Sequence, residues 1–414
     1  MKVTIHDIDQ AAKRLEDVIV QTPLQLSKRL SEKYSAHIYI KREDLQEVRS
    51  FKIRGAYNKI ASLSDEEKKR GIVAASTGNH AQGVAYSCAL LKIKGVIFMP
   101  VVTPNQKVEK VKHFGGKFVE IKLVGNTFDD AVKASDEYCK KHKLACIHPF
   151  DDAMTIAGQG TIGREIEEQL DEDVEIVVSP VGGGGLVSGI ASYLKQKDAH
   201  VKIYGVEAEG AASMAKSLEK GKVVALGEFD TFVDGAAVNI VGELTFATCK
   251  EYLEKVLVVP VGAVCTTMIE LYQNEGIIAE PAGALSIAAL DAIAKEIKGK
   301  KVVCILSGGN NDILRYPEIM ERSLVYQGRK HYFILEFTQK PGQLRKFVDD
   351  ALGPTDDIVR FEYMKKTNKE KGAALVGIEL KDKKDLEPLL ARMKKADLNF
   401  RILSDKELLY NYLI

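Results

Sequence analysis

The order of apolar segments along the chain is the feature that most limits its possible folds. Up to about residue 320, short apolar runs alternate with stretches in which apolar residues recur at helical spacing. Most runs are apolar throughout, as in strands that helices cover on both faces. The expected strands are 38–41, 72–75, 96–99, 118–123, 176–179, 203–207, 257–261 and 302–306. This alternation predicts an α/β fold with largely parallel strands, and their number favours two sheets.

The pattern changes after Tyr316. Residues 316–330 are mostly polar and predict a connector with a helical turn. From His331 the expected order is strand, helix, strand, strand, helix, strand, which is a ferredoxin-like βαββαβ unit. No catalytic constellation occurs in it, so we expect a role in binding or assembly. The predicted domains are a catalytic domain at 1–320, a connector at 321–330 and a C-terminal domain at 331–414.

Composition excludes several classes of protein. The chain has 414 residues, with 59 Lys plus Arg against 58 Asp plus Glu, so no strong net field favours nucleic acid or an anionic membrane. No apolar leader or membrane-length segment is present. The six cysteines are widely spaced, without a Cys-x-x-Cys pair. They indicate buried thiols in a reducing cytoplasm rather than disulfides or a zinc site.

The first candidate site surrounds Lys52. Apolar residues after it recur at helical spacing, and we expect Ser50 to be the N-cap of this helix. Lys52 then lies in the first helical turn, where the helix dipole disfavours a cation and lowers the lysine pKa. A neutral amine is the form that Schiff-base chemistry requires. The alternative, an exposed lysine at a helix end, is the commoner case when this motif is taken alone.

The second candidate is the run of four glycines at 182–185, which follows an expected strand and precedes an apolar helix. Glycine amides at a helix N-terminus can surround a phosphate group. A P-loop is excluded because no Gly-Lys-Ser/Thr follows. A dinucleotide site remains an alternative, since Glu207 ends the next strand where a ribose-binding acid is expected. The strict G-x-G-x-x-G pattern fails, however, because Val187 and Ser188 occupy the possible third-glycine positions.

Two further motifs lie at the ends of expected strands. Residues 76–80 combine hydroxyls, backbone amides and a helix N-terminus, which suit a carboxylate, and Asn79 could donate to a phenolate. His80 could act as a base, although a capping or packing histidine is commoner. Ser307 could meet a heterocyclic nitrogen; its neutral hydroxyl would not keep a pyridine protonated, which suits elimination over a long-lived carbanion. A simple turn is the alternative for Ser307.

Together, these motifs resemble the pyridoxal-phosphate serine/threonine dehydratase family, which has the tryptophan-synthase-β fold of two parallel-rich α/β subdomains. The similarity extends over nearly the whole chain, and the motifs occur in the family's order. The segments that carry it are Asp44 with residues 50–56, then residues 76–82, 182–186 and 307–310.

The resemblance implies a cofactor, pyridoxal 5'-phosphate, and a role for each motif. Lys52 would attach the cofactor and transfer the Cα proton, with Phe51 near the ring. Asn79 would bind the phenolic oxygen and Ser307 the pyridine nitrogen. The cofactor phosphate would be held by the amides of Gly182, Gly183, Gly184, Gly185 and Leu186. The substrate carboxylate would be bound by Ser76, Thr77, Gly78 and His80.

The implied reaction converts L-threonine to 2-oxobutanoate and ammonia, with L-serine as an alternative substrate. The C-terminal unit resembles the ACT-like regulatory domain of biosynthetic threonine dehydratases, with similar turns at 339–344 and 403–408. This resemblance implies the first step towards isoleucine, control by isoleucine and valine, and a homo-oligomer, either a dimer or a tetramer.

Two alternatives on other grounds stay open. A serine dehydratase or racemase, or a β-replacing synthase, could use the same scaffold, although the His80 loop favours the dehydratases. A nucleotide-binding protein could use the glycine loop. Related racemases bind a divalent cation near the residue equivalent to Glu207, but Ser213 stands here where a second acid is expected. We therefore expect no metal site.

Overall fold

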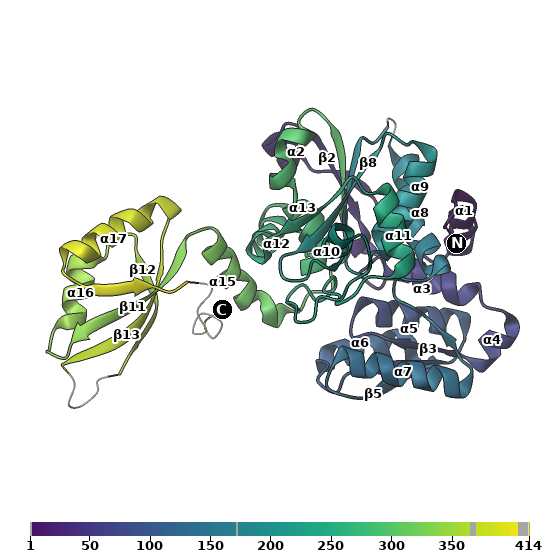
Figure 1. Cartoon of the computed structure of the whole chain (residues 1–414), viewed down its shortest axis with the longest axis horizontal. Helices are drawn as coiled ribbons and strands as arrows, with labels where there is room; N and C mark the ends of the chain where they lie inside the picture. Colours follow the sequence, from purple (N-terminus) through teal and green to yellow (C-terminus); the bar gives the residue numbers. More distant parts are fainter. Residues whose placement is uncertain (1, 171–172, 365–369, 405–412, 414) are drawn as a thin grey trace. The chain divides into compact units, whose positions relative to one another are not determined.

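The computed structural model describes residues 2–170, 173–364, 370–404 and 413 (Figure 1). The chain divides into two compact units. The first comprises Met1–Pro260 and Leu271–Asn311, and the second comprises Val261–Glu270 and Asp312–Ile414. Among the described residues, no helix has the length and apolar character needed to cross a membrane.

The larger sheet of the first unit has six strands in the order β1-β2-β10-β7-β8-β9. All neighbouring pairs are parallel except β1 with β2. Helices α9 (Gly185–Lys197) and α13 (Pro281–Ala288) both contact β7 and β8, and Figure 1 shows them on opposite sides of the sheet. The strands are β1 (Leu24–Leu26), β2 (His37–Arg42), β7 (Ile176–Pro180), β8 (Lys202–Ala208), β9 (Lys255–Val259) and β10 (Lys301–Leu306).

The smaller sheet is entirely parallel, in the order β5-β4-β3-β6. Its strands are β3 (Ile72–Ala75), β4 (Gly95–Met99), β5 (Val119–Leu123) and β6 (Ala145–Cys146). Ile72 and Ala74 belong to the apolar cluster that includes α5, whereas Val73 belongs to the cluster that includes α7. Successive residues of β3 therefore face opposite helical layers. Two parallel-rich sheets covered by helices confirm the predicted α/β architecture.

Helix α3 (Lys52–Ala61) packs between α5 (Asn79–Leu91) and α8 (Ala153–Gln169), and α8 packs on α9 (Gly185–Lys197). A Cβ at Gly158 of α8 would lie 2.5 Å from the carbonyl oxygen of Arg54, and one at Gly83 of α5 would lie 3.1 Å from the carbonyl carbon of Lys52. Backbone contact on both sides therefore fixes the start of α3 relative to both sheets.

Besides α3, α5, α8 and α9, the described residues up to 297 form ten α-helices. They are α1 (Ile5–Leu15), α2 (Lys28–Tyr34), α4 (Asp65–Arg70), α6 (Asn105–Gly115), α7 (Phe128–His142), α10 (Ser213–Lys220), α11 (Glu243–Tyr252), α12 (Val261–Glu275), α13 (Pro281–Ala288) and α14 (Ala294–Ile297). Short 3-10 helices are η1 (Glu43–Leu45), η2 (Gly116–Phe118) and η3 (Leu290–Ile293).

The bounds expected for one strand are wrong, and two short strands were not expected. The strand expected at 257–261 is β9, which ends at Val259 because Pro260 is the N-cap of α12. Two short strands, β1 and β6, have no counterpart among the expected strands. With two or three residues each, they carry too little alternation to be recognised from sequence.

The second unit contains the expected βαββαβ order. Its elements are β11 (Lys330–Thr338), α16 (Gln343–Ala351), β12 (Asp357–Tyr363), β13 (Lys371–Glu379), α17 (Leu386–Lys395) and β14 (Asn399–Ile402), with η4 (Ile313–Arg315) and η5 (Lys383–Asp385). The strands form an antiparallel sheet in the order β12-β13-β11-β14. Phe333, Leu335 and Phe337 lie in its core, as their alternation predicts.

The segment before β11 differs from the prediction of a single helical turn. It forms the eleven-residue helix α15 (Tyr316–Tyr326), in which Ile319 and Ser323 are buried. Ser323 Oγ lies 2.9 Å from Thr266 Oγ1 of α12, so α15 packs on α12. The predicted turn at 403–408 lies mostly outside the described residues.

Candidate active site

Lys52 is the first residue of α3, and Phe51 is the N-cap, with no side-chain capping bond. The expectation that Ser50 caps this helix is wrong, because Ser50 pairs with Gly308 in an isolated β-bridge. The buried Oγ of Ser50 has no hydrogen-bond partner among the described residues. The backbone amide of Phe51 donates to the carbonyl of Ser307 at 3.1 Å. The end of β10 therefore lies directly beside the residues that precede Lys52.

The amine of Lys52 lies in a site that favours its neutral form. Burial lowers its pKa to about 8, and the nearby carboxylate of Glu280 opposes this shift. The Lys52 Nζ donates to the carbonyl of Pro149 at 3.1 Å and lies 5.1 Å from the centre of the Phe51 ring. The pKa is lowered as expected, and loss of solvent on burial is the main cause.

The glycine loop joins the end of β7 to α9, which begins at Gly185. Among the described residues, the backbone amides of 183–187 donate to no acceptor. A Cβ at Gly183 would lie 2.3 Å from the Phe150 ring, and Gly184 has a φ of 92°. Packing against Phe150 therefore requires glycine at 183, and the backbone angle favours glycine at 184, two reasons that are not visible in the sequence. The loop also presents free N–H donors for an anion.

Asn79 is the first residue of α5, and its side chain has two partners. Its Nδ2 donates to Glu280 Oε1 at 2.6 Å, and its Oδ1 accepts from Asn310 Nδ2 at 2.8 Å. Glu280 is buried, and this burial raises its pKa to about 7, with Asp234 adding to the shift. The sequence analysis missed Glu280, because an acid before Pro281 has the same local pattern as an ordinary helix cap.

The loop at 76–80 lies at the N-terminus of α5, with Gly78 as its N-cap and open space beside Gly78. The amide of Gly78 donates to Ser76 Oγ at 3.2 Å. His80 Nε2 lies 2.9 Å from the carbonyl of Ile147, and burial lowers the His80 pKa to about 3. The ring is therefore neutral, with its proton on Nε2. The buried Nδ1, which lacks a partner among the described residues, is an acceptor.

Residues 147–150 connect three of the predicted motifs, although the sequence analysis did not single them out. Ile147 contacts His80 and Pro149 contacts Lys52, both through backbone carbonyls. The ring of Phe150 lies where a side chain on Gly183 would be, and the Cα and Cβ of Phe150 would lie 2.9 Å from a Cβ at Gly185. This segment follows the two-residue strand β6, which is too short to show a recognisable pattern in the sequence.

Ser307 lies at the end of β10 and is buried. Its Oγ donates to the Ala282 carbonyl at 3.4 Å, a long hydrogen bond that a better partner could replace. A Cβ at the following residue, Gly308, would lie 2.3 Å from Glu280 Oε1. The structure thus brings the ends of β3, β7 and β10 together around Lys52.

Glu207 occupies a different environment from the one a ribose-binding acid requires. Its carboxylate accepts from the amides of Met214 and Ala215, each at 2.8 Å, and so caps α10. Burial raises its pKa to about 7. Within the described part of the chain, no group of three or more His, Cys, Asp or Glu side chains is arranged to hold a metal ion.

The geometry agrees with comparisons against known proteins. Residues 15–308 match the family model of the pyridoxal-phosphate dependent enzymes. The chain belongs to this family. Residues 321–413 of this pyridoxal-phosphate dependent enzyme match a second model, the C-terminal regulatory domain of threonine dehydratase. The expected cofactor and the tryptophan-synthase-β-like fold are therefore confirmed.

Relatives of this pyridoxal-phosphate dependent enzyme are similar over their whole length. The biosynthetic L-threonine dehydratase of Halalkalibacterium halodurans is 52% identical over 413 residues, covering 100% of both chains. That of Bacillus subtilis is 51% identical, covering 100% of this chain and 98% of its own. A solved structure of threonine deaminase isoform 2 from Solanum lycopersicum is 41% identical with a TM-score of 0.73, covering 78% of this chain and 96% of its own. A solved structure of maize serine racemase is 32% identical with a TM-score of 0.72, covering 79% of this chain and 99% of its own.

The residues present fit pyridoxal phosphate. The amides of the glycine loop supply donors for the phosphate group, and Lys52 supplies an amine of lowered pKa. The unpartnered Oγ of Ser50 and Nδ1 of His80 leave polar atoms beside Lys52 for a bound molecule. These are the donors and acceptors that a phosphorylated pyridine aldehyde requires.

Proposed function

We propose that the chain dehydrates and deaminates L-threonine to 2-oxobutanoate and ammonia, the first step towards isoleucine. The observation that carries this proposal is the position of Lys52, a buried amine of lowered pKa that donates to Pro149, next to Phe150, which packs on the glycine loop. The identity of 52% over the full length to a biosynthetic L-threonine dehydratase supports the choice of substrate.

In this site, Lys52 would hold the cofactor and move the proton at the substrate Cα. The bound cofactor withdraws electrons from Cα and so acidifies its proton. With a pKa of about 8, the Lys52 amine is neutral in a useful fraction of molecules near neutral pH and can accept that proton. Phe51 would pack beside the ring.

The other motifs would bind and orient. Amides of Gly182, Gly183, Gly184, Gly185 and Leu186 would hold the phosphate, and Asn79 would donate to the phenolic oxygen. Ser307 would face the pyridine nitrogen with a neutral hydroxyl, which leaves the ring a weaker electron acceptor and favours rapid loss of the leaving group. The substrate carboxylate would lie at the N-terminus of α5, bound by Ser76, Thr77, Gly78 and His80. The only proton of the neutral His80 ring is on Nε2 and is donated to the Ile147 carbonyl, so His80 would bind the carboxylate through its backbone amide. This binding depends on hydrogen bonds rather than on an ion pair.

For the C-terminal part we propose regulation. Residues 1–320 would form the catalytic domain, 321–330 a connector and 331–414 a domain that binds isoleucine as inhibitor and valine as its opponent. The match of residues 321–413 to a regulatory domain of threonine dehydratase supports this division. We also propose a homo-oligomer, a dimer or a tetramer, in the cytoplasm.

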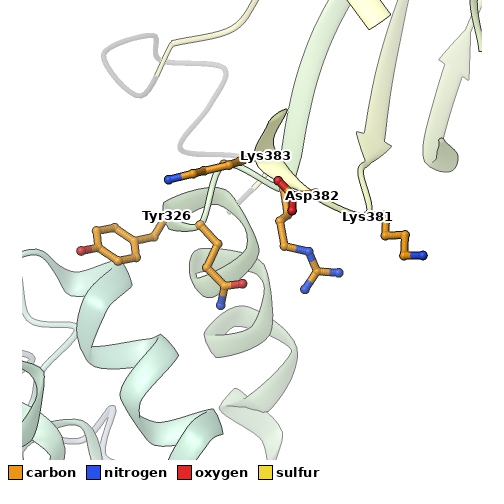
Figure 2. A pocket seen from close by; sticks show the side chains of 7 residues that line it. Tyr326, Lys381, Asp382 and Lys383 are labelled. Atoms are coloured by element: carbon orange, nitrogen blue, oxygen red, sulfur yellow. The ribbon is translucent and has the colours of Figure 1, made fainter. Parts of the chain in front are cut away.

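The second unit has an open cavity of about 660 Å³ between the end of α15 and the loop after β13 (Figure 2). Most of its lining is polar or charged, from Arg329, Lys381, Asp382 and Lys383, with Tyr326 on one side. Isoleucine would need an apolar pocket for its side chain. We therefore do not place the effector in this cavity.

The test of the proposed reaction is a product assay. Purified holoenzyme supplied with L-threonine should release equal amounts of 2-oxobutanoate and ammonia, and borohydride reduction should fix the cofactor to Lys52. L-serine is the comparison substrate, with D-serine measured as a product, because serine racemases share the fold. Formation of D-serine without 2-oxobutanoate, or labelling of another lysine, would contradict the proposal.

A further inference from the structure

The Asn79 amide is held at both ends, and its partners determine its orientation. Its Nδ2 donates to Glu280 Oε1 at 2.6 Å, and its Oδ1 accepts from Asn310 Nδ2 at 2.8 Å. Asn310 Nδ2 also donates to the Val48 carbonyl at 2.8 Å, which fixes the Asn310 NH₂ toward Asn79. An amide NH₂ only donates hydrogen bonds, and the Glu280 carboxylate in its ionised form only accepts them. Turning the Asn79 amide over would place oxygen against oxygen and NH₂ against NH₂. One N–H of Asn79 is thus committed to Glu280, and the other has a fixed direction.

The fold places the Glu280 carboxylate at Asn79 at some cost. Glu280 is the N-cap of α13, yet its side chain makes no capping bond. Its backbone amide instead donates to the carbonyl of Gly308 at 3.1 Å. The absence of a side chain at Gly308 leaves the space that Glu280 Oε1 occupies, because a Cβ there would approach to 2.3 Å. A helix-capping role therefore does not explain this buried acid.

An ion pair does not explain it either. The charged groups that act on Glu280 are Lys52 from α3, Lys107 from α6 and Asp234 from the loop after α10. The Nζ of Lys107 lies 2.5 Å from Oδ2 of Asp234, so this lysine is paired with Asp234. Within the described part of the chain, Glu280 has no basic group at ion-pair distance. Burying a carboxylate without a cation is unfavourable, which is why its pKa is raised to about 7. The hydrogen bond that the Glu280 carboxylate accepts from Asn79 is then the remaining explanation for its position.

We infer that Glu280 is a positioning residue, which fixes the Asn79 amide so that its second N–H is directed at the phenolic oxygen of the cofactor. This inference rests on the proposed cofactor site. Glu280 touches neither cofactor nor substrate in this role. Its effect passes through Asn79, and Asn310 assists by donating to the opposite end of the same amide.

A double-mutant cycle tests this coupling, with the cofactor dissociation constant and the absorbance band of the bound cofactor as readouts. Glu280→Gln keeps the size of the side chain but lets the Asn79 amide turn over, because a glutamine amide can both donate and accept. It should raise the dissociation constant by about tenfold and shift the band. In an Asn79→Ala background, the same substitution should change the constant by less than about twofold.

The control is Glu275→Gln, which removes a partly buried carboxylate paired with Arg29 outside the site and should leave both readouts unchanged. If Glu280→Gln does not fold, as judged by thermal unfolding, Asn310→Ala takes its place in the cycle with the same expected dependence on Asn79. If Glu280→Gln changes the dissociation constant equally in the presence and absence of the Asn79 side chain, Glu280 does not act through Asn79. That result would contradict the role of Glu280 without affecting the proposed cofactor site. An unchanged dissociation constant in Asn79→Ala itself would contradict the proposed cofactor site as well.

Discussion

Lys52 demonstrates how loss of solvent changes the chemistry of a common residue. A lysine in water has a pKa of about 10.4, so its amine is almost entirely protonated near pH 7. Burial at the start of α3 lowers the pKa to about 8. The same argument applies in reverse to Glu207 and Glu280, whose carboxyl pKa values burial raises to about 7. Both kinds of shift favour the neutral form.

The lowered pKa of Lys52 predicts how cofactor attachment depends on pH. Only the neutral amine attacks the aldehyde, so the attachment rate should rise by about tenfold per pH unit below pH 8 and level off above about pH 9. The measurement is the growth of the cofactor absorbance band after apo-protein is mixed with pyridoxal phosphate. A rate that keeps rising to pH 10 would indicate an unperturbed lysine.

Lys52→Ala should keep the fold, because alanine is well tolerated in a first turn, but lose nearly all turnover.

Ser307 allows a test of the electronic role of the pyridine partner. Ser307→Asp would favour a protonated ring and a longer-lived carbanion. Elimination from L-threonine should slow by roughly tenfold, a barrier increase of about 1.4 kcal/mol, with a new long-wavelength absorbance band during turnover. Ser307→Ala is the matched control, since it leaves the site neutral and should produce no such band. Full activity in Ser307→Asp would mean that residue 307 does not face the ring nitrogen.

At the scale of elements, the site forms where strand ends meet helix starts. The ends of β3, β7 and β10 are followed by the loops that carry Asn79, the four glycines and Ser307. In parallel sheets these ends lie on one side, next to the N-termini of the following helices. Close helix packing at Gly83 and Gly158 then holds α3 in place, so the position of Lys52 depends on both sheets.

The glycine loop predicts a sharp sensitivity to charge and size. Gly184→Asp adds a negative charge beside the proposed phosphate site, and the φ of 92° at this position disfavours any side chain. The dissociation constant of pyridoxal phosphate, measured by fluorescence titration, should rise by at least about tenfold.

Gly221→Asp is the control for backbone strain in this comparison. Gly221 has a φ of 70° but lies at the end of α10 with open space around it. That variant should lose some stability, by about 1 kcal/mol, without losing cofactor affinity. If both variants weaken cofactor binding equally, the effect of Gly184→Asp comes from strain and not from the phosphate.

At the scale of the whole molecule, the regulatory part can be removed without cutting into a packed helix. Helix α15 packs on α12 through Ser323 and Thr266, and Tyr326 covers Gly262. Truncation after Gln327 keeps these contacts, whereas truncation at residue 320 would break them. The βαββαβ unit has its own apolar core, which supports its study as a separate segment.

We predict that the chain truncated after Gln327 retains cofactor and threonine dehydratase activity but loses its response to isoleucine. In the full-length enzyme, isoleucine should weaken threonine binding, and threonine should weaken isoleucine binding by the same factor. Calorimetry measures isoleucine binding to the whole chain and to residues 331–414. Valine serves as competitor and leucine as control. Absence of both binding and inhibition would leave this unit with a role in assembly.

Most of the longer strands and the candidate motifs can be recognised in the amino-acid sequence alone. Apolar runs and helical spacing determine the α/β order, and the alternation at Phe333, Leu335 and Phe337 determines the C-terminal sheet. Lys52, the four glycines and Ser307 could be proposed as site residues because each motif is local, and the glycines and Ser307 directly follow strands. Local patterns are visible in sequence because strand and helix periods repeat over short distances.

The contacts around these residues depend on the tertiary structure. Glu280 meets Asn79 across 201 positions of sequence, and Pro149 meets Lys52 across 97. Ser50 pairs with Gly308 instead of capping α3. Such contacts leave no period in the sequence, because they depend on how separate helices and sheets pack. Burial, which sets the pKa values of Lys52 and Glu280, is likewise a property of that packing and not of residue type.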